Sequence, residues 1–127
     1  MRDKELSFWT CRGEKTAGFF VAEINEQVVG TVSYLKIENE NAIEIFRLSV
    51  DPKERGKGVA NELLWKVEST ALVFGIDKII AETSEPQTGA MKYYEKNGWE
   101  ETKRSYWSYL QLFLTVVIVT FVKKVKK

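Results

Sequence analysis

The stretch LSVDPKERGKGVANELLWKV, Leu48 to Val67, decides how this chain folds. It runs from a short apolar segment, through a charged turn with two glycines, into a helical pattern of apolar residues. The first turn of a helix leaves backbone N–H groups unpaired and carries partial positive charge, and glycine lets an anion approach those groups. Arg55 and Lys57 add full positive charges. The stretch therefore predicts a phosphate-binding turn, with a merely solvated basic turn as the alternative.

The composition narrows the chemistry that the chain can perform by itself. With 127 residues, 44% of them apolar, and a net charge of +1, it has the size of one globular domain and no bulk attraction for nucleic acid. It contains no histidine and one cysteine, Cys11, which excludes a histidine-based triad, a Cys/His zinc site and a disulfide framework. We therefore expect no metal and an inert Cys11 thiol. Because the charged start does not resemble a signal peptide, we expect a cytosolic location.

Apolar periodicity and turn residues predict six strands. The predicted strands are residues 19–24, 28–37, 42–50 and 78–83 and, at the C-terminus, residues 99–107 and 114–124. A tight hairpin turn separates the first two, and Gly30 in the second suggests a bulge or a close backbone approach. Consecutive strands joined by short loops pair antiparallel.

Two helices are predicted between these strands. Apolar residues recur at helical spacing over residues 59–74, and Gly75 ends this helix. A second helix occupies residues 86–98, with Pro86 near its start and Gly98 past its end. The strand–helix–strand crossover around the glycine turn makes its two strands parallel. The predicted fold class is α/β (α+β): a mixed, mostly antiparallel sheet with one central parallel crossover and flanking helices.

The common nucleotide-binding motifs do not match the glycine turn. The Walker pattern is absent, and Asn61 stands where the dinucleotide fingerprint Gly-x-Gly-x-x-Gly needs its third glycine. The segment RGKGVA, residues 55–60, instead resembles the Arg/Gln-x-x-Gly-x-Gly/Ala motif of the GNAT superfamily, the acetyl-CoA-dependent N-acetyltransferases.

A second segment strengthens this resemblance. AMKYYEKNGWEE resembles the family's motif Ala-x-x-x-Tyr-x-x-x-Gly-Phe/Trp, and its matching positions are Ala90, Tyr94, Gly98 and Trp99. The approach to it, AETSEPQTGAM, is most similar to the camello-like branch, which includes the cysteine-S-conjugate N-acetyltransferases. The resemblance extends from Phe19 to the C-terminus.

The resemblance implies that the turn binds the phosphates of acetyl-CoA. Backbone amides from Gly56 to Ala60 would hold the pyrophosphate, and the edge of Leu48–Val50 would bind the pantetheine arm like an added strand. The strands at 42–50 and 78–83 would splay apart to admit the acetyl thioester. A backbone N–H near Leu48–Val50 would polarise its carbonyl. The implied cofactor-binding residues are Leu48, Ser49, Val50, Arg55, Gly56, Lys57, Gly58, Val59 and Ala60.

Tyr94 is the candidate general acid. It matches the tyrosine whose hydroxyl faces the coenzyme A sulfur in this family, and an ordinary tyrosine pKa of about 10 suits an acid that is protonated at neutral pH. Helix periodicity alone favours a packing role for this ring. Tyr93 points about 100° away around the helix, so we expect it to be structural.

Glu44 is the candidate general base, and Glu82 is the second candidate. Glu44 matches the base glutamate of the histone-acetyltransferase branch. By strand alternation it shares an apolar face with Phe46 and Leu48, unless a bulge changes the alternation. The alternatives are solvated carboxylates at strand ends, or ordered water acting as the base.

The predicted function is transfer of an acetyl group from acetyl-CoA to a primary amine, either a small molecule such as a cysteine S-conjugate or a lysine. A coenzyme-A-binding module with little or no turnover is the alternative. Family members usually carry a strand and two helices ahead of the matched region, and about 18 residues precede Phe19. We therefore expect a single domain, residues 1–127, that lacks most of this region.

The uncharged segment Tyr106–Val122 has two interpretations. Aromatic residues at one end and lysines at the other fit a membrane anchor, but the length is at the lower limit for a span. Enrichment in Val, Ile and Thr favours a buried closing strand, which we prefer. By the family resemblance we expect the protein to be cytoplasmic or to lie at the cytosolic face of an internal membrane. A homodimer is kept as an alternative to a monomer.

Overall fold

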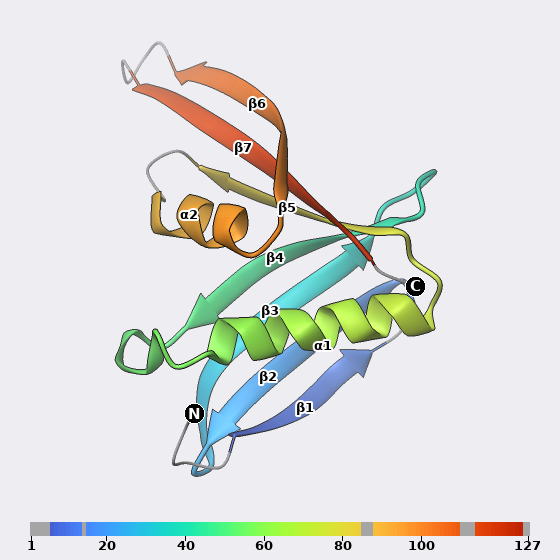
Figure 1. Cartoon of the computed structure of the whole chain (residues 1–127), viewed down its shortest axis with the longest axis vertical. Helices are drawn as coiled ribbons and strands as arrows, with labels where there is room; N and C mark the ends of the chain where they lie inside the picture. The colour runs from blue at the N-terminus through green and yellow to red at the C-terminus, as the bar shows by residue number, and fades with distance from the viewer. Residues whose placement is uncertain (1–5, 14, 85–87, 110–113, 126–127) are drawn as a thin grey trace.

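The computed structural model describes residues 6–13, 15–84, 88–109 and 114–125, which form one seven-stranded sheet with two α-helices (Figure 1). The elements are β1 (Leu6–Gly13), β2 (Ala17–Ile24), β3 (Gln27–Lys36), β4 (Ala42–Val50), the 3₁₀ turn η1 (Pro52–Glu54), α1 (Val59–Val73), β5 (Lys78–Ser84), α2 (Thr88–Lys96), β6 (Glu100–Tyr109) and β7 (Leu114–Lys124). The strand order across the sheet is β1-β2-β3-β4-β5-β7-β6.

The predicted fold class is confirmed. β4 and β5 form a parallel pair across the α1 crossover, and the other neighbouring strands pair antiparallel. The prediction was wrong in one respect, because it placed no strand before Phe19. β1 adds an edge strand that pairs with β2 from Leu6↔Ile24 to Gly13↔Gly18.

The β2–β3 hairpin shows why the chain turns where it does. Asn25 and Glu26 form a two-residue loop with φ of 52° and 65°, the left-handed conformation that tight hairpins require. Both expectations for Gly30 hold. The register shifts beside it, and a Cβ on Gly30 would lie 2.9 Å from side-chain atoms of Val59 and Leu63. Gly30 therefore lets the start of α1 pack closely on the sheet.

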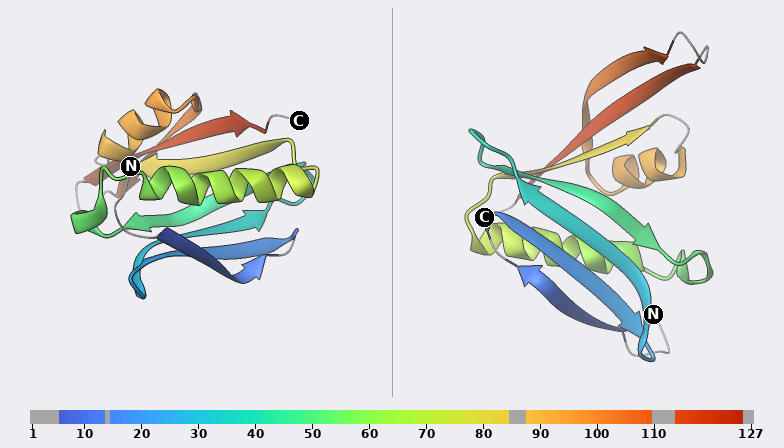
Figure 2. Two further views of the ribbon diagram at one scale, coloured as in Figure 1. Left: turned by 60° about the horizontal axis from the view of Figure 1, so that its bottom comes forward. Right: turned by 180° about the vertical axis from the view of Figure 1, so that it is seen from behind.

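One buried cluster takes side chains from both helices and from the sheet. α1 contributes the apolar stripe Val59, Leu63, Leu64, Val67 and Ala71, and α2 contributes Tyr94. Seen from behind, α1 lies behind β2 and β3 (Figure 2). Gly75, with φ of 72°, ends α1 as predicted, and the Ile76 N–H bonds the Ala71 carbonyl.

The second helix is also where the sequence places it. α2 ends before Gly98, which has a φ of 85°, and the Trp99 N–H bonds the Tyr94 carbonyl at 3.0 Å. The expected position of Pro86 near its start lies outside the described residues.

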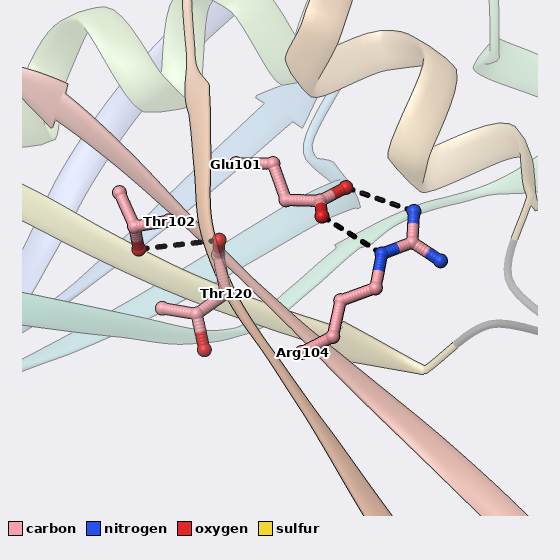
Figure 3. A network of polar contacts seen from close by, with 4 residues as sticks. All are labelled: Glu101, Thr102, Arg104 and Thr120. Atoms are coloured by element: carbon pink, nitrogen blue, oxygen red, sulfur yellow. Dashed lines mark hydrogen bonds and ion pairs between the residues drawn. The ribbon is translucent and has the colours of Figure 1, made fainter.

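The described residues of the segment Tyr106–Val122, a candidate membrane anchor by sequence, lie in the two closing strands. Residues 106–109 belong to β6 and residues 114–122 to β7, so the strand interpretation is confirmed for these residues. A bulge interrupts β6 between Glu101 and Lys103, and the Arg104 guanidinium spans it with two hydrogen bonds of 2.8 Å to the Glu101 carboxylate (Figure 3). Within the described ranges, no helix is long and apolar enough to cross a membrane.

Candidate active site

A cavity of about 760 Å³ opens where the two parallel strands part. β4 and β5 pair from Ala42↔Lys78 to Ile45↔Ala81, and beyond that point they diverge (Figure 1). The cavity is lined by the second half of β4, the glycine turn, the start of α1, the end of β5, and α2. The splayed strands that the resemblance implied are therefore present.

The cavity brings together most of the residues that the sequence proposed for the cofactor. Its lining includes Leu48, Ser49, Val50, Arg55, Gly56, Gly58, Val59 and Ala60. Lys57 does not contribute to the lining. Its ammonium group forms an ion pair of 3.1 Å with the buried carboxylate of Glu54, which does line the cavity, so the charge of Lys57 is engaged by a protein carboxylate.

The glycine turn is open where an anion would approach. Gly56 and Gly58 have φ of 77° and 85°, and a Cβ built on either would meet no atom within 4 Å. Gly58 is the N-cap of α1 and supplies no side-chain cap, so the cap leaves the first-turn N–H groups to other acceptors. Such an N-terminus fits a phosphate group. Arg55, whose Nε lies 3.4 Å from the Val50 carbonyl, adds a positive charge at the cavity.

A bulge in β4 changes which side chains face the cavity. Arg47 has a φ of 56°, and Arg47 and Leu48 together occupy the place opposite Val32. Before the bulge Phe46 points away from the core and is 37% exposed, whereas after it Leu48 packs against the core. The expectation that Glu44 shares a face with Leu48 is therefore wrong, because the bulge reverses the alternation between them. Glu44 does share a face with Phe46.

The two candidate bases form a pair. Glu44 lies beside Ile80 in the parallel ladder, which places Glu82 diagonally across from it on the same face. Burial, a side-chain hydrogen bond with Glu82 and the charge of Glu82 together raise the pKa of Glu44. Glu82 belongs to the lining of the cavity and Glu44 does not, so Glu82 connects Glu44 to the cavity.

Tyr94 lines the cavity from the α2 side. It is 7% exposed, and its ring centroid lies 5.0 Å from that of Trp99 and 5.3 Å from that of Phe121. Burial raises the pKa of the Tyr94 hydroxyl, which therefore keeps its proton at neutral pH. The packing role and the position expected for the acid are thus compatible in one residue.

The sequence did not identify several residues of the cavity wall. Tyr93, expected to be structural, lines the cavity together with Lys96 and Asn97, and its hydroxyl bonds the Asn61 side chain at the start of α1. Positions 93, 96 and 97 share a helix face at spacings of three and four residues. That spacing was available in the sequence, but it does not say which helix face meets a cavity. The contact with Asn61 depends on how the two helices meet and had no local signal.

The class of protein follows from this arrangement. A mixed sheet that opens between its parallel strands, with a glycine turn on one side of the opening and a buried tyrosine on the other, has the architecture implied by the two motifs. The family model described as "Acetyltransferase (GNAT) family" matches residues 1–99, and the chain belongs to this family.

Individual relatives agree with the family and its camello-like branch. The chain is 37% identical over 92 residues to human N-acetyltransferase 8B, covering 69% of this chain and 40% of that protein. It is 32% identical over 126 residues to rat N-acetyltransferase 8, covering 96% of this chain and 55% of that protein. The chain thus spans about half the length of these curated relatives. A Bacillus anthracis protein described as a streptothricin acetyltransferase, solved with acetyl coenzyme A, has the same fold, with a TM-score of 0.81 at 24% identity over 89% of this chain and 65% of that one.

Proposed function

We propose that this chain transfers an acetyl group from acetyl-CoA to a primary amine. The observation that carries the proposal is the cavity between β4 and β5, which the open glycine turn, Tyr94 and Glu82 all line. The residues needed for binding the cosubstrate, for protonating a leaving group and for accepting a proton therefore surround one space. Acetyl-CoA supplies the activated acetyl group as a thioester.

Binding of acetyl-CoA is supported by the fit of the turn and of the cavity. The backbone amides of the glycine turn and the start of α1, from Gly56 to Ala60, would hold the pyrophosphate, and Arg55 would add a charged contact. The cavity volume of about 760 Å³ lies within the range of small-molecule sites. A solved protein of this fold contains acetyl coenzyme A.

Tyr94 would act on the leaving thiolate. Its hydroxyl keeps its proton at neutral pH because burial raises its pKa, so it can donate a hydrogen bond or a proton to a developing negative charge. Backbone N–H groups near the β4 bulge, around Leu48–Val50, would stabilise charge on the carbonyl oxygen.

The carboxyl pair Glu44 and Glu82 would remove the proton from the attacking amine. A carboxylate with a raised pKa is a stronger base than an ordinary one, and the pKa of Glu44 is raised by burial and by Glu82. Since Glu82 lines the cavity and hydrogen-bonds Glu44, the pair offers a route for a proton from the cavity to Glu44.

For the acceptor we propose an S-substituted cysteine, with lysine as the second candidate. This choice rests on the resemblance to the camello-like branch. We keep two predictions from the sequence: the protein lies in the cytoplasm or at the cytosolic face of an internal membrane, and it can form a homodimer.

The test is acetyl-CoA turnover with S-substituted cysteines, a lysine peptide and a polyamine as acceptors. We expect thiol release to be fastest with an S-substituted cysteine. Stabilisation by coenzyme A in a thermal melt without turnover on any acceptor would favour the second candidate, a coenzyme-A-binding module. If coenzyme A does not stabilise the chain and no acceptor is acetylated, the proposal is wrong.

A further inference from the structure

Tyr93 and Asn61 join the two helices at the wall of the cavity. Asn61 lies in the first turn of α1, three residues after Gly58, and Tyr93 lies on α2 beside Tyr94. Both side chains line the cavity, and the Tyr93 hydroxyl donates a hydrogen bond to Asn61 Oδ1. This contact links the helix that begins at the glycine turn to the helix that carries the candidate acid.

The surroundings of Tyr93 keep it in this role as a donor. Burial, together with the neighbouring Tyr94 hydroxyl, raises the pKa of Tyr93 to about 12, so its hydroxyl stays protonated over the working pH range. The Tyr93 carbonyl accepts a hydrogen bond of 2.8 Å from Asn97 Nδ2, and its ring meets the Tyr94 ring edge-on at 5.7 Å. The ring is therefore held in place, and its hydroxyl is directed at α1.

Tyr94 does not depend on this hydroxyl for its own position. Its ring packs between Trp99 and Phe121 within the core. Loss of the Tyr93 hydroxyl would leave those ring contacts in place. The Tyr93–Asn61 bond instead joins α2 to the start of α1 at the cavity.

We propose that Tyr93, through its hydrogen bond to Asn61, is a positioning residue that fixes the spacing of α1 and α2 and so tightens the cavity on the coenzyme A part of acetyl-CoA. This inference rests on the proposed function and deepens it. Two adjacent tyrosines then divide the work: Tyr93 sets affinity for the cosubstrate, and Tyr94 acts in the chemical step.

The experiment removes each partner of the bond in the full chain. Tyr93→Phe and Asn61→Leu should each raise KM for acetyl-CoA, and Kd for coenzyme A by titration calorimetry, by about 2- to 12-fold, which is the net effect of one neutral hydrogen bond. The kcat should stay within about twofold of its original value. Because both changes remove the same contact, the double variant should bind about as well as the weaker single variant.

Tyr106→Phe is the matched control, since it removes a tyrosine hydroxyl from a side chain that is 68% exposed on β6, outside the cavity. If Tyr93→Phe binds coenzyme A as tightly as Tyr106→Phe, or if the two single effects simply add, the positioning role is wrong. A tenfold loss of kcat in Tyr93→Phe would also overturn it. Should Tyr93→Phe fail to fold, Asn61→Leu carries the same test. Failure of the unmodified chain to bind coenzyme A would instead overturn the proposed function.

Discussion

Glu44 and Glu82 lie diagonally across the parallel strands β4 and β5 and share a side-chain hydrogen bond. The ladder neighbours of Glu44 are apolar, Leu35 on β3 and Ile80 on β5, and partial burial disfavours the charged form of Glu44. One proton held between two carboxyl groups satisfies both, because the protonated group donates to the ionised one. The two carboxylates that the sequence offered as alternative bases are thus one unit.

The first prediction concerns the pH dependence of turnover. With Glu44 as the base, kcat should rise with pH through its raised pKa. Glu44→Gln should abolish this limb and lower the rate at neutral pH by about 10²–10⁴-fold, with partial recovery at high pH where the free amine is abundant. Glu82→Gln removes the negative charge that helps to raise the pKa of Glu44, so the rise in kcat should move to lower pH. The measurement is kcat against pH for the three proteins.

The same pair predicts a change in stability, with a defined sign. Because the pKa of Glu44 is raised on folding, the folded chain binds more protons than the unfolded chain between the two pKa values. The contribution of this carboxyl to stability is complete below its unfolded pKa and is lost as pH rises through the folded pKa. In thermal melts, the stability of Glu44→Gln should not show this dependence on pH.

The rate profiles also decide between the two carboxylates. If Glu82→Gln removes the rise of kcat with pH and Glu44→Gln leaves it unchanged, Glu82 is the base.

The second prediction separates the chemical and packing roles of Tyr94. Tyr94→Phe keeps the ring that packs against Trp99 and Phe121 and removes only the hydroxyl. Stability and coenzyme A binding should be nearly unchanged, while kcat should fall by about 10²–10⁴-fold. Steady-state kinetics and a melt in the presence of coenzyme A make the comparison. A normal kcat would leave Tyr94 with packing alone.

The third prediction uses two glycines of α1 with matched backbone strain. Gly58 and Gly75, at opposite ends of the helix, have φ of 85° and 72°, and a Cβ on either meets nothing within 4 Å. Alanine at each position should therefore lower the free energy of unfolding by a similar amount, about 1–2 kcal/mol. Coenzyme A at 100 times its Kd should stabilise the original chain and Gly75→Ala by about 2.7 kcal/mol. Gly58→Ala should lose most of this shift, because its methyl group occupies the open space in front of the helix.

A fourth prediction compares the two cations of the turn. Arg55 lines the cavity, whereas Lys57 is paired with Glu54. Arg55→Ala should raise KM for acetyl-CoA by about tenfold or more, the effect of losing a charge-assisted hydrogen bond, and Lys57→Ala should raise it by less than about twofold. Each variant removes one positive charge, so a difference between them reflects contact and not net charge. Equal losses would show that the turn acts only through its overall charge.

The sequence determined the features that depend on local backbone chemistry. Glycines at positions of positive φ marked the turn before α1 and the end of each helix, and alternating apolar residues marked the strands. Because a motif fixes the conformation of neighbouring residues, residues 48–67 were enough to predict the glycine turn, and the strand pattern at 78–83 completed the prediction of the parallel crossover. Local sequence did not predict the edge strand β1, because its pairing with β2 is what defines it.

The tertiary structure alone decided which side chains meet. The bulge at Arg47 reverses the alternation of β4, and the register of β4 on β5 sets Glu44 against Glu82. The link between Tyr93 and Asn61 arises where two helices converge on one cavity. The contact between the two glutamates depends on the sum of many small choices of register and packing angle, and a one-residue shift in a strand moves a side chain to the opposite face. Local sequence patterns do not specify strand register or helix packing angle. The contact between the two glutamates and the bond between Tyr93 and Asn61 could therefore be identified only from the tertiary structure.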